Sequence, residues 1–288
     1  MAVHFAPGFV YNGGYEQAQP LEATDLNKVV ILTGGTSGIG RATVELLRKQ
    51  GCTVYEFSRR PAPADSWHRS VDVTDGAAVK AAVDAVAERE GRIDILINNA
   101  GFGISGAMEF TDPADAHRLM EVNLFGMDNA IRAALPHMRQ ARSGRIVNIS
   151  SVAGVFAIPF QAWYSISKAA VRALTMALYN EVAPFGIQVT SVMPGDIRTG
   201  FTAARKKSVE GDDVYGGRIS ASVAKMERDE QNGMRPEDAA KTIARVALKK
   251  GRVKPFYAIG LSYKFLVLLD SLLPCRAVRW LLFQLYGK

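Results

Sequence analysis

The sequence predicts an α/β fold with a doubly wound parallel sheet in a single domain. The 288 residues are 48% hydrophobic and 22% charged, which is the balance of one globular domain with a substantial core. From residue 28 onward, short runs of β-branched residues alternate with longer helical patterns. The short runs are continuously apolar, as expected of strands that are buried on both faces of a sheet.

Strands and helices follow one another in the order that such a sheet requires. The expected strands are KVVILTG, TVYEFS, SVDV, IDILINN, RIVNIS, IQVTSVM and residues 255–259. The expected helices cover residues 39–50, 77–90, 115–139 and 162–182, and one more opens at RPEDAA. Residues 28–260 therefore form the predicted domain, in which the polar residues 201–233 are expected to be an insertion or a lid over the substrate.

The two ends of the chain lie outside this pattern. The arm at residues 1–27 is rich in glycine and aromatic residues, and three fates are open for it: a frayed end, a strap between subunits, or a cover over the active site. The tail at residues 261–288 is apolar but is divided by charges and by Pro274, so it is too interrupted to span a bilayer. Packing against the domain or another subunit is favoured over contact with a membrane or with the entrance for a lipid-like substrate.

Composition argues against several classes of function. Lys and Arg total 35 against 28 Asp and Glu, a net charge of +7, yet no block of like charges marks a nucleic-acid footprint. The basic clusters at residues 205–207 and 249–254 are expected to be solvated faces. Cys52 and Cys275 form no disulfide framework and fit a reducing cytoplasm. The four histidines lack the spacing of metal ligands, so no metal site is expected.

The segment TGGTSGIG, residues 33–40, follows a strand and opens a helix, as a Rossmann-type dinucleotide-binding turn does. Gly34, Gly38 and Gly40 would allow the tight turn, the close approach of backbone to a pyrophosphate and the packing of helix on strand. The sequence therefore predicts a nicotinamide dinucleotide site at this turn.

The end of the second strand predicts which nicotinamide cofactor binds there. An acidic side chain at this place would accept a hydrogen bond from a ribose 2′-hydroxyl and would repel a 2′-phosphate. The sequence has Ser58, followed by Arg59 and Arg60, which favours NADP(H) because guanidinium groups bind phosphate. Glu56 lies only two residues upstream, so NAD(H) remains open.

A tyrosine and a lysine four residues apart indicate proton-transfer chemistry. Tyr164 and Lys168 share one face of an expected helix, and the ammonium is expected to lower the pKa of the phenol. Tyr164 would then exchange a proton with the substrate oxygen while hydride moves between substrate and nicotinamide. Ser151, at the end of a strand, is placed to hold the same oxygen, although local chemistry does not separate it from Ser150.

Six motifs, in one order and at one spacing, resemble the short-chain dehydrogenase/reductase family: TGGTSGIG, NNAG, VNLFG, NISSVAG, YSISK and PGDIRT. The resemblance covers residues 28–259 and implies an NAD(P)-dependent enzyme acting on CH–OH groups, assembled as a homodimer or homotetramer. It selects Ser151 over Ser150 by the spacing to Tyr164. It also implies that Asn123 helps to hold a proton-relay water near Lys168, and that Lys168 contacts the nicotinamide ribose.

The same resemblance implies a larger set of residues around the cofactor. Asp72 would meet the adenine, Asn99 would border the adenosine, and Thr199 would bond the carboxamide. The implied cofactor-binding residues are Gly34, Thr36, Ser37, Gly38, Ile39, Gly40, Ser58, Arg59, Arg60, Asp72, Val73, Asn99, Ala100, Gly101, Tyr164, Lys168, Pro194, Gly195, Ile197 and Thr199.

Substrate specificity is expected from the loops at residues 104–109, 155–162 and 197–233. One apolar group lies between Ser151 and Tyr164 and indicates either a pocket for a hydrophobic alcohol or ketone, or ordinary core. Its members are Val155, Phe156, Ile158, Phe160 and Trp163. With the arm and tail added, the chain is similar to bacterial hydroxysteroid dehydrogenases, 20β-hydroxysteroid dehydrogenase in particular, which implies a steroid-like substrate. A reductase of another lipid-like or acyl ketone, and a catalytically silent dinucleotide sensor, are the alternatives.

Overall fold

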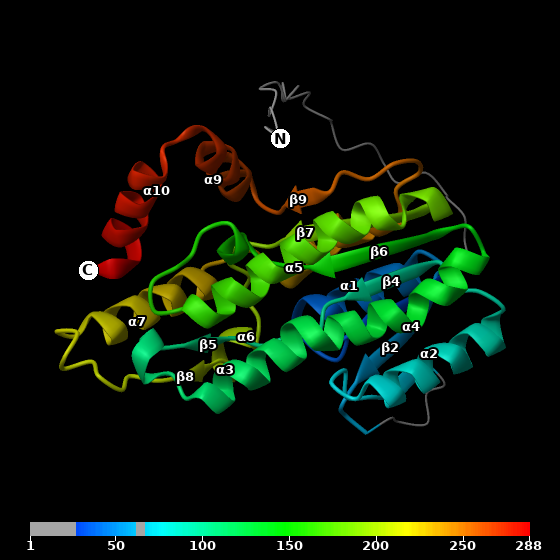
Figure 1. Cartoon of the computed structure of the whole chain (residues 1–288), viewed down its shortest axis with the longest axis horizontal. Coiled ribbons are helices and arrows are strands. Elements are labelled where there is room, and N and C mark those ends of the chain that lie inside the picture. The colour runs from blue at the N-terminus through cyan, green and yellow to red at the C-terminus, as the bar shows by residue number, and fades with distance from the viewer. Residues whose placement is uncertain (1–26, 62–66) are drawn as a thin grey trace, which may run out of the picture.

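The computed structural model of the chain describes residues 27–61 and 67–288. Seven parallel strands form one sheet in the order β3-β2-β1-β4-β6-β7-β9 (Figure 1). The strands are β1 (Val29–Thr33), β2 (Thr53–Ser58), β3 (His68–Ser70), β4 (Ile95–Asn98), β6 (Gly144–Ile149), β7 (Ile187–Met193) and β9 (Phe256–Ala258). This confirms the predicted α/β class and the doubly wound parallel sheet. The three fates considered for the arm at residues 1–27 concern a segment that, except for Asn27, lies outside the described residues.

Helices cover both faces of the sheet because successive strand residues point to opposite sides. Val29 and Ile31 of β1 pack with α2 (Gly76–Glu90), α4 (Gly126–Gln140) and α5 (Ala162–Glu181) on one side. Val30 and Leu32 pack with α1 (Gly38–Lys49) and α8 (Pro236–Leu248) on the other. The apolar strands are therefore buried on both faces, as their uninterrupted runs predicted.

Helix boundaries follow local capping chemistry. Helix α2 begins where the Asp75 carboxylate accepts a hydrogen bond of 2.9 Å from the Ala78 backbone N–H, and it ends at Gly91, whose φ of 71° an L side chain rarely adopts. Helix α8 begins with Pro236 in its first turn, where the missing N–H costs nothing. Short helical turns complete this part of the chain: η1 (Met108–Phe110), η3 (Val152–Gly154) and η4 (Ala183–Phe185).

The single helix predicted over residues 115–139 is wrong in detail. The chain forms α3 (Pro113–Met120), then a π-helical turn η2 (Glu121–Phe125), and then α4. The extra residue in the π-helical turn changes the direction of the side chains that follow, and such turns are often found at functional sites. Here the turn contains Asn123, which is fully buried.

The predicted insertion at residues 201–233 contains α6 (Phe201–Ala204), β8 (Lys206–Lys207) and α7 (Arg218–Gln231). Strand β8 pairs with β5 (Ile104–Ser105) in a separate two-stranded parallel sheet, so the insertion is joined to the loop that follows β4. One member of the basic cluster at residues 205–207 is not solvated, because the Arg205 side chain has no exposed surface. The prediction for Arg205 is therefore wrong.

The tail forms α9 (Leu261–Leu272), α10 (Cys275–Leu282) and a final π-helical turn η5 (Phe283–Gly287). Figure 1 shows it leaving the edge of the sheet at β9 and returning toward α7. Within the described residues, no helix has the length and apolar content needed to cross a membrane.

Candidate active site

A cavity of 1130 Å³ opens where the strands of the central sheet end. Its walls come from the segments that follow β1, β2, β4, β6 and β7, which is the edge where open α/β sheets bind ligands. Every residue predicted to touch the cofactor lines this cavity, as do Ser151, Tyr164 and Lys168. Asn123 is the one predicted site residue that lies behind the wall.

The glycine turn leaves the amino end of α1 facing this cavity. Gly38 has a φ of 54°, which favours glycine, and a Cβ on Gly40 would lie 2.2 Å from the Gly34 carbonyl oxygen. Asn99 holds the turn in place, because its side-chain amide donates to the carbonyl oxygens of Thr33 at 3.2 Å and Gly34 at 2.9 Å. Asn99 thus fixes the turn as well as bordering the cavity. The N–H groups at the start of α1 form a site for an anion such as a pyrophosphate.

The end of β2 gives the cavity a second polar region. The Ser58 hydroxyl oxygen is buried and has no hydrogen-bond partner among the described residues, while Arg59 and Arg60 are exposed beside it. Glu56 is turned away from this region: one of its carboxylate oxygens accepts a hydrogen bond of 2.8 Å from the Gly35 backbone, and the other contacts His68. Glu56 is therefore occupied in holding the glycine turn.

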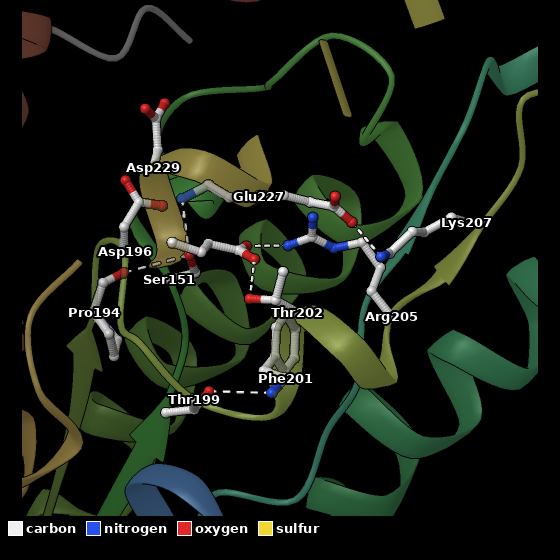
Figure 2. A network of polar contacts seen from close by, with 12 residues as sticks. Ser151, Pro194, Asp196, Thr199, Phe201, Thr202, Arg205, Lys207, Glu227 and Asp229 are labelled. Atoms are coloured by element: carbon white, nitrogen blue, oxygen red, sulfur yellow. Dashed lines mark hydrogen bonds and ion pairs between the residues drawn. The ribbon is translucent and has the colours of Figure 1, made fainter. Parts of the chain in front are cut away.

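The two serines after β6 have different surroundings. The Ser150 hydroxyl donates to the Lys168 backbone carbonyl at 2.8 Å and is buried against α5. The Ser151 hydroxyl faces the cavity, where it is 3.4 Å from the Pro194 carbonyl oxygen (Figure 2), and Tyr164 lines the same cavity. Geometry thus favours Ser151, as the family spacing did.

Lys168 and Asn123 lie next to each other behind Tyr164. The Lys168 ammonium donates to the Ile149 carbonyl oxygen at 3.0 Å and lies 5.6 Å from the centre of the Tyr164 ring. The Asn123 side chain is held by the backbone of Phe102 and by the Ser167 hydroxyl. The π-helical turn thus places an amide near the lysine, since a Cβ on Gly101 would lie 3.0 Å from Asn123 Oδ1 and 3.7 Å from the Lys168 ammonium nitrogen.

The expected lowering of the phenol pKa by Lys168 is absent from the structure. Burial raises the pKa of Tyr164 to about 12, and this outweighs the hydrogen bond from Ser151, which lowers it. Burial also lowers the pKa of Lys168 to about 8, because the charged ammonium loses hydration. At pH 7 the phenol therefore carries its proton, which suits a general acid.

The depressed pKa of Lys168 predicts how stability varies with pH. Between about 8 and the ordinary value of 10.5, the unfolded chain holds a proton that the folded chain has lost. The stabilisation is thus complete above pH 10.5 and is lost as pH falls through 8, by a total on the order of 3 kcal/mol. Lys168→Met should remove this slope and should be more stable than wild type at pH 7. Urea denaturation of both proteins at pH 7, 8, 9 and 10 measures the free energy of unfolding at each pH. If this free energy varied with pH in the same way in both proteins, the depressed pKa of Lys168 would be contradicted.

Several residues of the site were not predicted. Phe201 covers Tyr164, with ring centres 5.8 Å apart, and Asp196, Arg118 and Glu230 also line the cavity. Glu230, from α7, pairs with the buried Arg205 and accepts a hydrogen bond of 2.6 Å from the Thr202 hydroxyl; Figure 2 shows Arg205 and Thr202 in this network. Asp196 lies within the motif PGDIRT and could have been found there. No sequence motif pointed to Glu230, because it lies in a polar segment far in sequence from Ser151 and Tyr164.

The predicted apolar group is divided between pocket and core. Ile158 lines the cavity. Phe160 instead packs against a small cluster around Ile219 and Val223, with its ring 5.6 Å from that of Tyr215. The insertion therefore draws part of this segment away from the site.

Comparison with known proteins agrees with this geometry. A model of the short chain dehydrogenase family matches residues 28–210. The chain belongs to the short-chain dehydrogenase/reductase family. A 3-ketodihydrosphingosine reductase of Bacteroides thetaiotaomicron is 40% identical over 227 residues, which cover 77% of this chain and 84% of that protein.

Solved structures of the same family share the fold. A short-chain dehydrogenase from Streptomyces avermitilis is 36% identical, with a TM-score of 0.76 over 86% of this chain and 94% of that one. ElxO with NADP bound is 27% identical, with a TM-score of 0.69 over 83% and 99% of the two chains. A 3-ketoacyl-(acyl-carrier-protein) reductase from Brucella melitensis complexed with NADH is 25% identical, with a TM-score of 0.67 over 81% and 96%.

This short-chain dehydrogenase/reductase is thus an NAD(P)-dependent oxidoreductase that interconverts alcohols and ketones. The residues present fit the cofactor: the glycine turn has no Cβ where Gly40 meets Gly34, and the Ser58 hydroxyl is buried without a partner among the described residues. When bound, the nicotinamide supplies or accepts the hydride. The start of α1 would hold its pyrophosphate and the segment after β2 its adenosine ribose. Enzymes of this family bind small-molecule substrates and are typically oligomeric.

Proposed function

We propose that this enzyme reduces the ketone of a long-chain, lipid-like substrate with NADPH. One observation carries the proposal: Tyr164 and Ser151 lie in one cavity wall with the apolar residues Phe102, Val152, Ile158 and Phe201, and the carboxylates of Asp196 and Glu230 add a few polar groups to that wall. Apolar pockets with a few polar groups select hydrophobic ligands and orient one reacting group. The similarity to a 3-ketodihydrosphingosine reductase supports a ketone on a long alkyl chain.

Each polar group has a separate task in this reaction. The Ser151 hydroxyl holds the substrate carbonyl oxygen and stabilises the negative charge that develops on it. Tyr164, protonated because its pKa is about 12, donates its proton to that oxygen. Lys168 is held by the Ile149 carbonyl and lies near Asn123. In its protonated form, the Lys168 ammonium stabilises the Tyr164 phenolate that remains after proton transfer.

The preference for NADPH rests on the end of β2. Ser58 and two arginines suit a 2′-phosphate, and Glu56 is held elsewhere by Gly35 and His68. Ser58→Asp should therefore raise KM for NADPH by about tenfold or more and leave KM for NADH unchanged or lower, because the new carboxylate repels the phosphate and accepts from the ribose hydroxyls. Initial rates with both cofactors measure the change. A wild-type enzyme that already prefers NADH would refute this part of the proposal.

A substrate panel tests the substrate class. We expect NADPH oxidation with 3-ketodihydrosphingosine, weaker oxidation with a short β-ketoacyl thioester, and none with 3-, 7-, 12-, 17- or 20-keto steroids. A steroid turned over in preference to the sphingoid ketone would restore the hydroxysteroid hypothesis, including the 20β position. Preference for the acyl thioester would favour an acyl ketone reductase, as the Brucella melitensis structure represents. Cofactor binding without any turnover would indicate a silent dinucleotide sensor.

A further inference from the structure

The tail carries an apolar stripe that stays exposed in the part of the chain that the structure describes. Four residues spaced by four, three and four positions lie on one face of α9 and are exposed: Leu261 by 85%, Phe265 by 62%, Leu268 by 39% and Leu272 by 71%. No residue of α9 is buried. A contiguous helical face of this kind on a folded protein marks an interaction surface.

The second helix also exposes apolar side chains, and it adds positive charge. Trp280, Phe283 and Leu285 of α10 and η5 are about half exposed, at 61%, 47% and 50%. Arg276 and Arg279 are exposed on α10 beside them. Basic residues next to exposed Trp, Phe and Leu are typical of helices that lie in the interface of a membrane.

The charges of the tail are almost all of one sign. Its charged side chains are Lys264, Asp270, Arg276, Arg279 and Lys288. The basic ones are exposed, whereas Asp270 is half-buried and interacts with Arg172 of α5. The outward face of the tail is therefore apolar and positive, with no exposed carboxylate.

The inward face of the tail is fixed to the catalytic domain by two tyrosines. Tyr263 of α9 donates a hydrogen bond to Asp196, which lines the cavity, and its ring packs on Gly195. Tyr286 of η5 donates to Asp229 of α7 at 3.1 Å, next to the cavity residue Glu230. These contacts hold the tail beside the cavity residue Asp196 and beside the neighbour of the cavity residue Glu230, so the exposed stripe belongs to a surface near the cavity. Figure 1 shows the tail running from the end of β9 back toward α7.

We propose that the outer face of α9, α10 and η5 docks on an anionic lipid membrane. A helix of 12 residues is about 18 Å long, far less than the roughly 30 Å of hydrocarbon in a bilayer, so α9 lies in the plane of the interface. Leu272, Trp280 and Phe283 enter the boundary between headgroups and acyl chains, and Arg276 and Arg279 bind lipid phosphates.

A second copy of the chain fits this face less well. In a two-fold contact, the same patch meets itself. The exposed basic residues, Lys264, Arg276 and Arg279 among them, would then face like charges with no exposed carboxylate of the tail to pair with. An anionic lipid surface complements both the apolar stripe and the charge.

Vesicle flotation with the full chain tests the docking surface without any substrate, so its outcome is independent of the proposed function. We expect wild-type protein to float with vesicles of phosphatidylcholine and phosphatidylglycerol, and to bind phosphatidylcholine vesicles at least about tenfold more weakly. Phe265→Glu with Trp280→Glu should abolish binding, and Arg276→Glu with Arg279→Glu should remove the preference for anionic lipid. The matched controls Val214→Glu, an apolar residue exposed by 72% in the insertion, and Arg252→Glu, an exposed basic residue before β9, should bind like wild type.

A second readout guards against misfolded variants. Cys275 is exposed at the start of α10 and Cys52 is buried, so a polarity-sensitive dye can be attached at Cys275 alone. Its emission should shift to shorter wavelength with anionic vesicles. No flotation and no shift with wild-type protein would overturn the proposal, as would unchanged binding in folded Phe265→Glu, Trp280→Glu protein. Dimers that the same two changes dissociate, without vesicle binding, would assign the face to a second copy.

Discussion

Replacing Tyr164 with phenylalanine should lower kcat for ketone reduction by about 100- to 10,000-fold, the contribution typical of a general acid. The substitution removes only the hydroxyl, whereas the ring keeps its contact with Phe201 at 5.8 Å. Cofactor affinity should fall much less than kcat, because the substitution leaves the glycine turn and the end of β2, which are proposed to hold the pyrophosphate and the adenosine ribose, unchanged. Single-turnover rates and cofactor titration by nicotinamide fluorescence separate the two effects.

The two serines after β6 provide a matched control. Ser151→Ala should lower kcat strongly, because the hydroxyl at the cavity is lost. Ser150→Ala removes a buried hydrogen bond to the Lys168 carbonyl, so it should cost about 1 kcal/mol of stability and little activity. If Tyr164→Phe kept the wild-type kcat, the assignment of Tyr164 as the proton donor would be wrong.

The sequence predicted most of the sheet because its strands are local patterns. The apolar runs at residues 29–33 and 187–193 need no distant partner to be recognised as buried strands. The third strand was predicted at SVDV, which begins at residue 70. The observed strand β3, His68–Ser70, pairs with β2 and begins two residues earlier. The π-helical turn at Asn123 was missed because its apolar spacing resembles that of an ordinary helix.

The structure brings the predicted residues to one cavity, but the electrostatics of that cavity differ from the prediction. The motifs place Gly34, Ser151 and Tyr164 at strand ends that a parallel sheet brings together, and the structure has all three at one cavity. The pKa of Tyr164 depends on how much water surrounds it, which spacing along a helix does not reveal. Burial therefore reversed the expected direction.

The burial of Arg205 could not be predicted from the sequence either. Three basic residues in a row suggested a solvated face, but only Lys206 and Lys207 are exposed. Their neighbour turns inward because Glu230, twenty-five positions later on α7, supplies a carboxylate. Pairing across such a distance has no local pattern in the sequence.

Glu230→Ala should destabilise the fold by about 3–5 kcal/mol, the cost typical of leaving one member of a buried ion pair without its partner. The Arg205 side chain has no exposed surface, and its Nε and Nη1 atoms have no hydrogen-bond partners in the part of the chain that the structure describes. The Thr202 hydroxyl would lose its acceptor as well. Urea denaturation followed by far-UV circular dichroism measures the change.

Glu227, one turn earlier on α7, is the matched control (Figure 2). It pairs with Lys207, whose side chain is 37% exposed, so Glu227→Ala should cost no more than about 1 kcal/mol. Glu230→Leu should also destabilise the protein, because it leaves the Arg205 charge buried. Adding Arg205→Met to this variant should recover most of the lost stability, since two apolar side chains leave no buried charge. If Glu230→Ala cost no more than Glu227→Ala, Arg205 would have to reach water or another partner. The Arg205–Glu230 pair would then contribute to substrate binding or catalysis and not to stability. The insertion would be held over Tyr164 mainly by the packing of Phe201 and Ile219.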